Sequence, residues 1–337
     1  MMNFYKILFF NLLVFSTLIC ISALSWMTAW LGLEMNLLSI IPLMKTYTNK
    51  NSAEAAIKYF IVQAMASAIL MFSIMIFSSL NFFNLKFLYM PSMIMNATLL
   101  GKMGAAPFHI WFPEVISGLA WNIVIIILTW QKIAPFILLS YCISSSTFLS
   151  ITIILSSLIG GLQGLNQVCT RKILAYSSIN HMGWMISTLL SSLNLWSLYF
   201  AIYSLMNFSI TMMFHKYSIF YMSQVPKMLS YNKKLKYMFM MNFLSLGGLP
   251  PFIGFLPKWI TINALMNLKH NFMCFILVSF TLLTLYFYIR ISFSSFSFYS
   301  LESFSESWKT KLNPMFFASN IAILTSIPMC FSMPWLF

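Results

Sequence analysis

Long runs of apolar residues, separated by short polar connections, make up most of this chain of 337 residues. A helix needs about 20 apolar residues to cross the hydrocarbon of a bilayer. These runs are continuously apolar and do not alternate as the strands of a membrane barrel do. The pattern therefore predicts an all-α integral membrane protein with about eleven transmembrane helices. The expected helices cover 4–22, 25–44, 56–79, 91–112, 119–141, 145–163, 171–190, 194–214, 237–264, 272–294 and 315–336.

An internal repeat lies inside two of these runs. The segment 104–114 (GAAPFHIWFPE) aligns without gaps on 248–258 (GLPPFIGFLPK), at an offset of 144 residues. The offset covers five predicted helices, an odd number, so the two copies are expected to cross the membrane in opposite directions. Prolines interrupt helical hydrogen bonding, and inverted repeats with interrupted helices at matching places are typical of transporters.

The repeat predicts how the chain is organised. We expect two inverted five-helix repeats with a broken helix in each, at about 4–141 and 145–294. A terminal helix follows at about 315–336. Because no polar block is long enough to fold outside the bilayer, these parts are expected to form a single membrane domain over 1–337.

Three lysines and one glutamate lie in the middle of long apolar stretches, and they are Glu34, Lys102, Lys132 and Lys258. An ionised side chain at the centre of a membrane helix costs about 2.5–3.5 kcal/mol even on lenient scales, and such groups mark ion or proton routes. The chain has only five acidic residues, all of them glutamates. A lysine can give up and regain its proton, which an arginine cannot. The four residues are therefore candidate proton carriers.

Each candidate also has a structural interpretation. Lys102 and Lys132 are compatible with lysines that bond backbone carbonyls at a helix break, and Lys258, nearer a span end, with one that snorkels to the interface. Glu34 is expected to partner Lys102, either as a static ion pair or as a switch that releases a proton when the pair separates. At an effective dielectric of ~20, charges ~4 Å apart attract by about 4 kcal/mol.

Two histidines extend the list of candidates. His109 lies beside the proline of the first break, and His181 lies in a polar stretch of another span. Histidine shuttles protons near neutral pH, and a hydrogen-bonded core histidine is the alternative for both. Glu54 and Lys58 are four residues apart at a helix start and are expected to form a local pair.

Composition and charge exclude several other classes of protein. Hydrophobic residues make up 60% of the chain and charged residues 7%, against about 25% charged in average soluble domains. The net charge of +14 comes from basic residues in short connections, which argues against a nucleic-acid partner. Five widely spaced cysteines without a C-x-x-C pair give no support to a metal site or an iron–sulfur cluster.

The connections also predict an orientation. Basic residues gather on one side, which by the positive-inside rule is the cytoplasmic or matrix side, with the N-terminus on it and the C-terminus opposite. That side receives Lys45, Lys50, Arg171, Lys172, Lys216, Lys227, Lys233, Lys234, Lys236, Lys309 and Lys311, and the other receives Lys86 and Lys269.

Several motifs, in this order, resemble the subunit 2 family of mitochondrial NADH:ubiquinone oxidoreductase (complex I), in its insect form. The motifs are GLEMN at 32–36, EAAIKY at 54–59, KMGAAPFHIWFPE at 102–114, WQKIAP at 130–135, GLNQ at 164–167, RKILAYSSINHMGW at 171–184 and LSLGGLPPFIGFLPKW at 244–259. The resemblance covers nearly the whole chain, and only the loops at 80–90, 215–236 and 300–313 match poorly.

The resemblance implies an antiporter-like, proton-translocating subunit of the complex I membrane arm. In that family a Glu–Lys pair, a central lysine and a lysine of the second half carry protons, and they match Glu34, Lys102, Lys132 and Lys258. It implies an enzyme only as a subunit of the proton-translocating NADH:ubiquinone reductase, with no redox centre of its own. NADH, FMN, iron–sulfur clusters and ubiquinone would belong to other subunits.

Location and partners follow from the same resemblance. The chain would be a multi-pass protein of the mitochondrial inner membrane, with its N-terminus on the matrix side and its C-terminus on the intermembrane-space side. Other membrane-arm subunits and phospholipids, cardiolipin among them, would be its partners. Two rival functions remain open at this stage: a self-standing cation/proton antiporter, against which the lack of any aspartate counts, and a scaffold whose lysines only stabilise packing.

Overall fold

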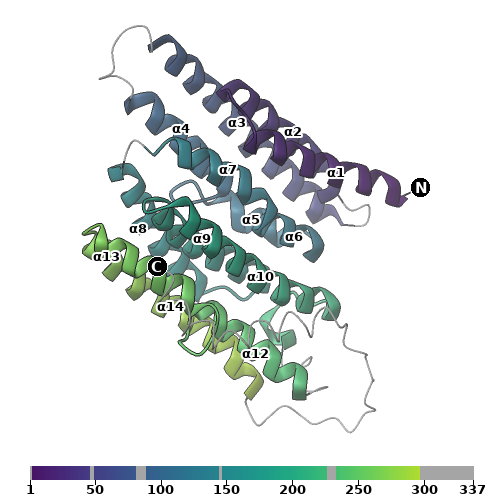
Figure 1. Ribbon diagram of the computed structural model, residues 1–337. Helices are drawn as coiled ribbons and strands as arrows, with labels where there is room; N and C mark the ends of the chain where they lie inside the picture. Colours follow the sequence, from purple (N-terminus) through teal and green to yellow (C-terminus); the bar gives the residue numbers. More distant parts are fainter. Residues whose placement is uncertain (1, 46–48, 81–88, 144–145, 226–232, 297–337) are drawn as a thin grey trace. The chain divides into compact units, whose positions relative to one another are not determined.

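The computed structural model describes residues 2–45, 49–80, 89–143, 146–225 and 233–296, and these residues are helical apart from short connections and one isolated β-bridge (Figure 1). The chain divides into two compact units, Met1–Leu155 and Ser156–Phe337. The division lies within helix α8 (Ser146–Leu165).

The first unit is built from helices packed in chain order. Its helices are α1 (Met2–Ile21), α2 (Trp26–Met44), α3 (Lys50–Leu80), α4 (Tyr89–Met103), α5 (Trp111–Gly118), α6 (Trp121–Leu128) and α7 (Trp130–Tyr141). Helix α2 packs against α1 and α3, and α3 packs in turn against α4 and α5. Helix α7 contacts both α1 and α4, which brings the later half of the unit back onto its beginning.

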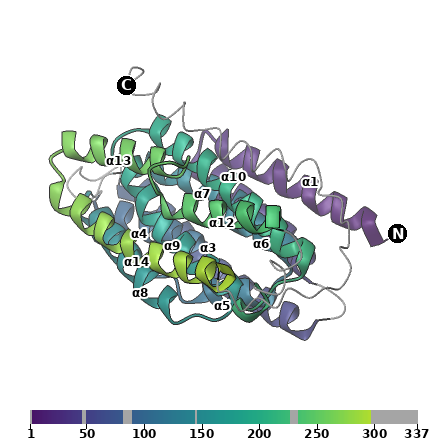
Figure 2. The ribbon, with the colours of Figure 1, turned by 90° about the horizontal axis from the view of Figure 1, so that it is seen from below.

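The second unit is organised around one largely buried helix. Its elements are α9 (Thr170–Leu189), α10 (Leu193–Tyr217), the short helix η2 (Met222–Gln224), α12 (Lys233–Gly247), α13 (Phe255–Asn267) and α14 (Asn271–Phe296). Helix α9 contacts α10, α13 and α14, which lie around it in Figure 2. Its polar side chains therefore face protein, and Ser178, Asn180 and His181 are all buried.

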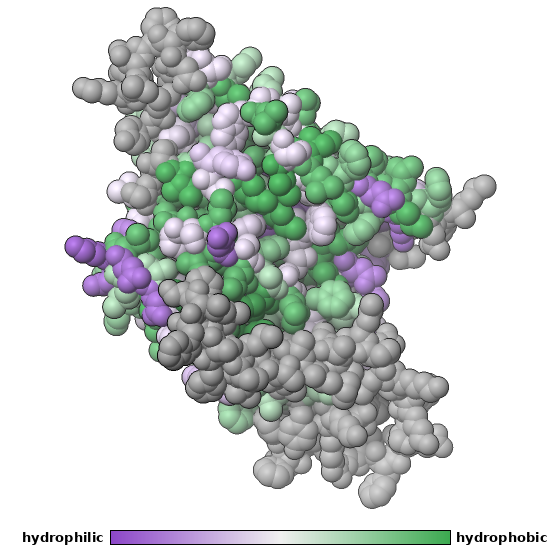
Figure 3. All heavy atoms as spheres, in the orientation of Figure 1, coloured by the Kyte–Doolittle hydropathy of each residue, from purple (hydrophilic) through white to green (hydrophobic). Residues whose placement is uncertain are grey.

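The surface of the described helices is strongly apolar, as the sequence predicts for contact with lipid. Phe4 of α1, Phe72 of α3 and Phe275 of α14 are 74%, 61% and 73% exposed. Figure 3 shows apolar side chains over most of the visible described surface, with few hydrophilic ones among them. Seven helices within the described residues are long and apolar enough to cross a membrane.

The all-helical membrane prediction is confirmed, and non-helical loops interrupt two of the predicted spans, 91–112 after α4 and 237–264 between α12 and α13. The span expected at 91–112 ends at Met103, where α4 stops before a non-helical loop. The span expected at 119–141 is present as one apolar helical stretch long enough to cross a membrane, Trp121–Tyr141, in which Thr129 marks the boundary between α6 and α7. The Thr129 hydroxyl donates to the Ile125 carbonyl (2.7 Å), a contact that bends helices. The terminal helix expected at 315–336 lies outside the described residues, so the number of eleven spans stays a prediction.

Candidate functional site

Helix α4 ends at a glycine in the left-handed region. Gly104 has a φ of 77°. Its N–H donates to the Gly101 carbonyl (3.2 Å), and the Ala105 N–H donates to the Leu100 carbonyl (3.0 Å). Both bonds together form the Schellman ending, in which the residue after the helix takes a positive φ that suits glycine. The carbonyls nearest the helix end still need donors from elsewhere.

Neutral side chains supply these donors at the first break. Gln63 of α3 donates through Nε2 to the Lys102 carbonyl (3.1 Å), and Trp111 donates through Nε1 to the Gly101 carbonyl (3.2 Å). The Gln63 side chain is buried. In the described part of the chain, no hydrogen bond joins the Lys102 ammonium to a carbonyl of this break, so Lys102 does not act as its cap.

Helix α12 ends in the same way at the second break. Gly248 has a φ of 80°, its N–H donates to the Ser245 carbonyl (3.0 Å), and the Leu249 N–H donates to the Leu244 carbonyl (3.4 Å). Each of these bonds lies 144 residues after its counterpart at the first break. The two breaks therefore share one backbone geometry.

A lysine completes the second break. The Lys258 ammonium donates to the Gly247 carbonyl (2.9 Å) and to the Leu246 carbonyl (3.4 Å). Lys258 is 6% exposed, so its side chain points into the protein and does not snorkel to the surface. A Cβ on Gly248 would lie 2.9 Å from the Lys258 Nζ, so the glycine also makes room for the lysine.

Glu34 and Lys102 interact electrostatically in the first unit. Glu34 is on α2 and Lys102 on α4, and the charge of Glu34 acts on the Lys102 ammonium. No direct ion pair joins them among the residues that the structure describes. Glu34 Oε1 is buried and has no hydrogen-bond partner within the same residues. The arrangement places a half-buried acid and a buried lysine on neighbouring parts of the unit without a direct ion pair between them in the described residues.

Lys132 is the most deeply buried of the candidates. It lies in the first turn of α7, is 1% exposed, and its Nζ is 5.5 Å from the centre of the Phe112 ring. An ammonium at this distance from an aromatic face is attracted by the ring quadrupole. Phe112 belongs to α5, directly after the first break, so the ring connects the surroundings of Lys132 to that break.

An amide pair beside these residues was missed by the sequence analysis. Gln131 of α7 donates through Nε2 to Asn36 Oδ1 of α2 (2.9 Å). Asn36 lies two residues after Glu34, and Gln131 lies directly before Lys132. The sequence motifs contain both amides, but no sequence signal pairs residues that are 95 positions apart.

The two histidines are buried and hydrogen-bonded. His181 Nδ1 lies 2.9 Å from the Tyr199 hydroxyl, and its ring centre is 5.2 Å from that of Tyr203. His109 Nδ1 lies 3.2 Å from the Pro107 carbonyl. These contacts fit a core histidine and leave the predicted role in proton transfer as a hypothesis.

Charged residues at the surface of the first unit form a separate group. Lys58 pairs with Glu54 on the same helix (2.9 Å), as predicted, and also with Glu114 on α5 (2.9 Å). All three side chains are between 42% and 66% exposed. Their exposure distinguishes them from the buried candidates.

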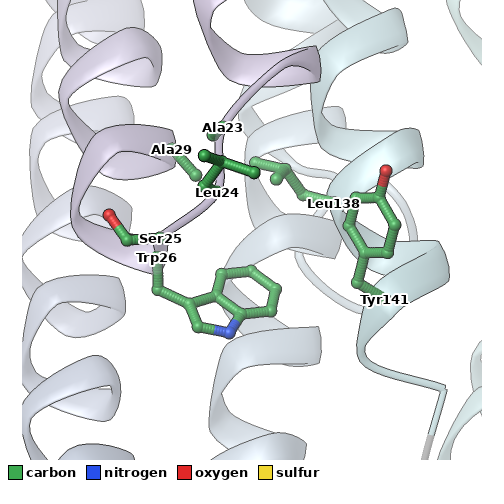
Figure 4. A pocket seen from close by; sticks show the side chains of 7 residues that line it. All are labelled: Ala23, Leu24, Ser25, Trp26, Ala29, Leu138 and Tyr141. Carbon is green, nitrogen blue, oxygen red and sulfur yellow. The ribbon is translucent and has the colours of Figure 1, made fainter.

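A pocket of about 280 Å³ opens at the turn between α1 and α2, against the end of α7 (Figure 4). The turn is held by Ser25, whose hydroxyl accepts from the Thr28 N–H (3.3 Å). No candidate charged residue lines this pocket. Its lining residues are Ala23, Leu24, Ser25, Trp26, Ala29, Leu138 and Tyr141. Within the described residues, no group of three or more His, Cys, Asp or Glu could hold a metal ion.

The model of one protein family, described as the NADH:quinone oxidoreductase/Mrp antiporter transmembrane family, matches residues 23–284. The chain belongs to this family. Its similar members include the NADH-ubiquinone oxidoreductase chain 2 of Locusta migratoria, 43% identical over 96% of this chain and 94% of the relative. That of Anopheles gambiae is 47% identical over 91% of this chain and 89% of the relative. The predicted resemblance to the subunit 2 family in its insect form is thus confirmed.

Two solved structures share the fold of this chain. A chain of respiratory complex I from Thermus thermophilus aligns with a TM-score of 0.85 at 22% identity, over 99% of this chain and 79% of that one. A chain of the Mrp complex from Dietzia sp. aligns with a TM-score of 0.73 at 16% identity, over 83% of this chain and 58% of that one. The antiporter-like membrane fold predicted from the sequence is therefore present.

Proposed function

We propose that this chain is a proton-translocating membrane subunit of NADH:ubiquinone oxidoreductase. Relatives that match nearly its whole length carry that name. The observation that carries the proposal is the burial of Lys132, 1% exposed, in an otherwise apolar protein. A buried cation is costly in a membrane, so its presence favours a role in moving charge.

The proposed carriers are Glu34, Lys102, Lys132 and Lys258. The geometry at Lys258 suits a group that changes charge, because a neutral amine keeps two N–H donors for the Leu246 and Gly247 carbonyls after it loses a proton. Glu34 and Lys102 are proposed to act as a pair whose opposite charges stabilise each other while they are close, so that a small separation would favour release of a proton. His109 and His181 are proposed as additional members of the route.

The proposal includes the architecture around these residues. Eleven spans would form two inverted repeats and a terminal helix, and the matched glycine endings of α4 and α12 support the repeat. The subunit would lie in the mitochondrial inner membrane with its N-terminus on the matrix side. Other membrane-arm subunits and phospholipids, including cardiolipin, would surround it. NADH, FMN, iron–sulfur clusters and ubiquinone would act in other subunits and supply the driving energy.

The test is Lys132→Ala in the intact complex, reconstituted into vesicles and driven by NADH. The expected result is a loss of protons translocated per NADH oxidised, with normal assembly of the complex. Lys132→Arg should be equally defective because arginine keeps its proton. Lys58→Ala, which removes an exposed lysine, serves as the control.

Three outcomes separate the rival functions. Loss of translocation in both Lys132 variants supports the proposal. Unchanged translocation in Lys132→Ala would show that the lysine only stabilises packing. Sodium-coupled transport by the purified chain alone would identify a self-standing antiporter. The structural similarity to a chain of the Mrp complex is the reason to test this activity.

A further inference from the structure

The Asn36–Gln131 amide pair joins the helix of one candidate carrier to the helix of another. The Gln131 Nε2 lies 2.9 Å from Asn36 Oδ1, which is the distance of a well-formed hydrogen bond. Asn36 is only 4% exposed. A buried amide that loses its partner costs the full desolvation of the group, so the pair is expected to stay closed.

The pair lies at a point where α7 lacks support from its own backbone. Thr129, with φ −116° and ψ −74°, separates α6 from α7, and these angles depart from helical values. The Lys132 N–H donates to the Thr129 carbonyl (3.2 Å), three residues back. Pro135 has no N–H, so the Gln131 carbonyl has no donor four residues on. The first turn of α7 therefore depends on side chains for its orientation.

The amide bond between Asn36 and Gln131 does not use the charged groups of Glu34 or Lys132. Successive residues of a helix are about 100° apart around its axis. Asn36 is two residues from Glu34, or about 200° around α2, and Gln131 is one residue from Lys132, or about 100° around α7. Helix α1 packs against both α2 and α7. The amides can thus fix the spacing of the two helices while Glu34 and Lys132 face other directions.

We propose that Gln131, bound to Asn36, is a positioning residue that holds the first turn of α7 so that Lys132 keeps the orientation needed for proton transfer. This inference rests on the proposed function of the chain. A neutral amide pair suits the role because it adds no charge that would compete for the proton. Misplacing a reacting group by about 1 Å can cost up to a hundredfold in rate.

The first test is Gln131→Met in the intact complex, since methionine keeps the volume and loses the hydrogen bond. Protons translocated per NADH oxidised should fall about two- to tenfold, the equilibrium factor that one neutral hydrogen bond represents. The pH profile of translocation should also move, because the surroundings of Lys132 change. The amount of assembled complex should stay the same. Gln163→Met, at an exposed position of α8, is the matched control and should change nothing.

The second test exchanges the two amides. Asn36→Gln combined with Gln131→Asn keeps the total number of methylene groups and should restore most of the translocation lost in Gln131→Met. A double variant as defective as Gln131→Met would overturn the inference. The inference would also be overturned if Gln131→Met left both the translocation ratio and the pH profile unchanged. The same holds if translocation falls only because less complex is assembled.

Failure of the positioning role of Gln131 can be distinguished from failure of the proposed function. If Lys132→Ala abolishes translocation and Gln131→Met leaves it intact, the carrier role stands and only the positioning role is wrong. If Lys132→Ala translocates normally, the proposed function fails, and the positioning inference fails with it.

Discussion

The breaks after α4 and α12 have the same backbone ending and differ in the side chains that complete it. At both, a glycine with positive φ closes the helix through two matching hydrogen bonds. Gln63 and Trp111, both neutral, cover the carbonyls of the first break. The Lys258 ammonium covers those of the second. Neutral side chains therefore donate the hydrogen bonds that complete the first break, whereas a charged side chain donates those of the second.

This difference assigns different tasks to the two lysines. Lys102 precedes its break and is left to interact electrostatically with Glu34. Lys258 follows its break and is bonded into the end of the preceding helix. Loss of Lys102 should therefore affect proton transfer alone, while loss of Lys258 should affect both proton transfer and the fold. The comparison can be tested by separating these two consequences.

The largest effect is expected for Lys258→Met. The substitution leaves the Leu246 and Gly247 carbonyls without their donor, and each unsatisfied buried group costs about 1–3 kcal/mol. A total of about 2–6 kcal/mol, the sum for both carbonyls, should lower the amount of assembled complex. Native gel analysis of the membranes, with Lys102→Met as the reference that keeps its break intact, measures this loss.

Lys258→Arg separates the two roles of this residue. An arginine can donate to both carbonyls but does not release its proton. Assembly should recover, while proton translocation per NADH oxidised stays low. Recovery of both would show that Lys258 only caps the helix, and recovery of neither would show that the cap depends on the exact shape of lysine.

A smaller effect is expected for Gln63→Leu at the first break. The Lys102 carbonyl would lose one neutral donor, which costs about 1–3 kcal/mol when the group stays buried. The last turn of α4 would then hold Lys102 less firmly. We expect a lower thermal stability of the purified complex and a partial loss of translocation. Gln63→Glu, which introduces a second acid near Lys102, should be worse than Gln63→Leu, and equal behaviour of the two would contradict the capping role.

The two helix breaks can be predicted from the sequence, but the side chains that complete them cannot. The offset of 144 residues between Gly104 and Gly248 predicted two interrupted helices, because glycine and proline have strong backbone preferences that a sequence displays. From the sequence, snorkelling stays open for Lys258, because the distance of a residue from a span end does not give the direction of its side chain. In the structure Lys258 is buried, so its side chain points into the protein.

One physical reason explains why Gln63 and Gln131 cannot be recognised from the sequence. Gln63 and Gln131 lie in apolar runs as single amides, and their partners are 39 and 95 residues away along the chain. An amide has no periodicity and no charge that would indicate such a partner. The boundary at Thr129 was missed for a similar reason, because a threonine inside an apolar run is compatible with an unbroken helix. Only the packing of helices brings these groups together.

The smallest effect is expected at Glu114, which occupies the position of the first repeat that matches Lys258. Glu114 Oε2 pairs with Lys58 Nζ (2.9 Å), but the two side chains are 49% and 42% exposed. Surface ion pairs contribute little because water screens them, and Lys58 keeps Glu54 as a partner. Glu114→Gln should leave assembly and proton translocation unchanged in the assays used for Lys258. A loss of translocation as large as that in Lys258→Arg would mean that the matched position carries charge transfer in both repeats, and the contrast between a neutral and a charged break would no longer hold.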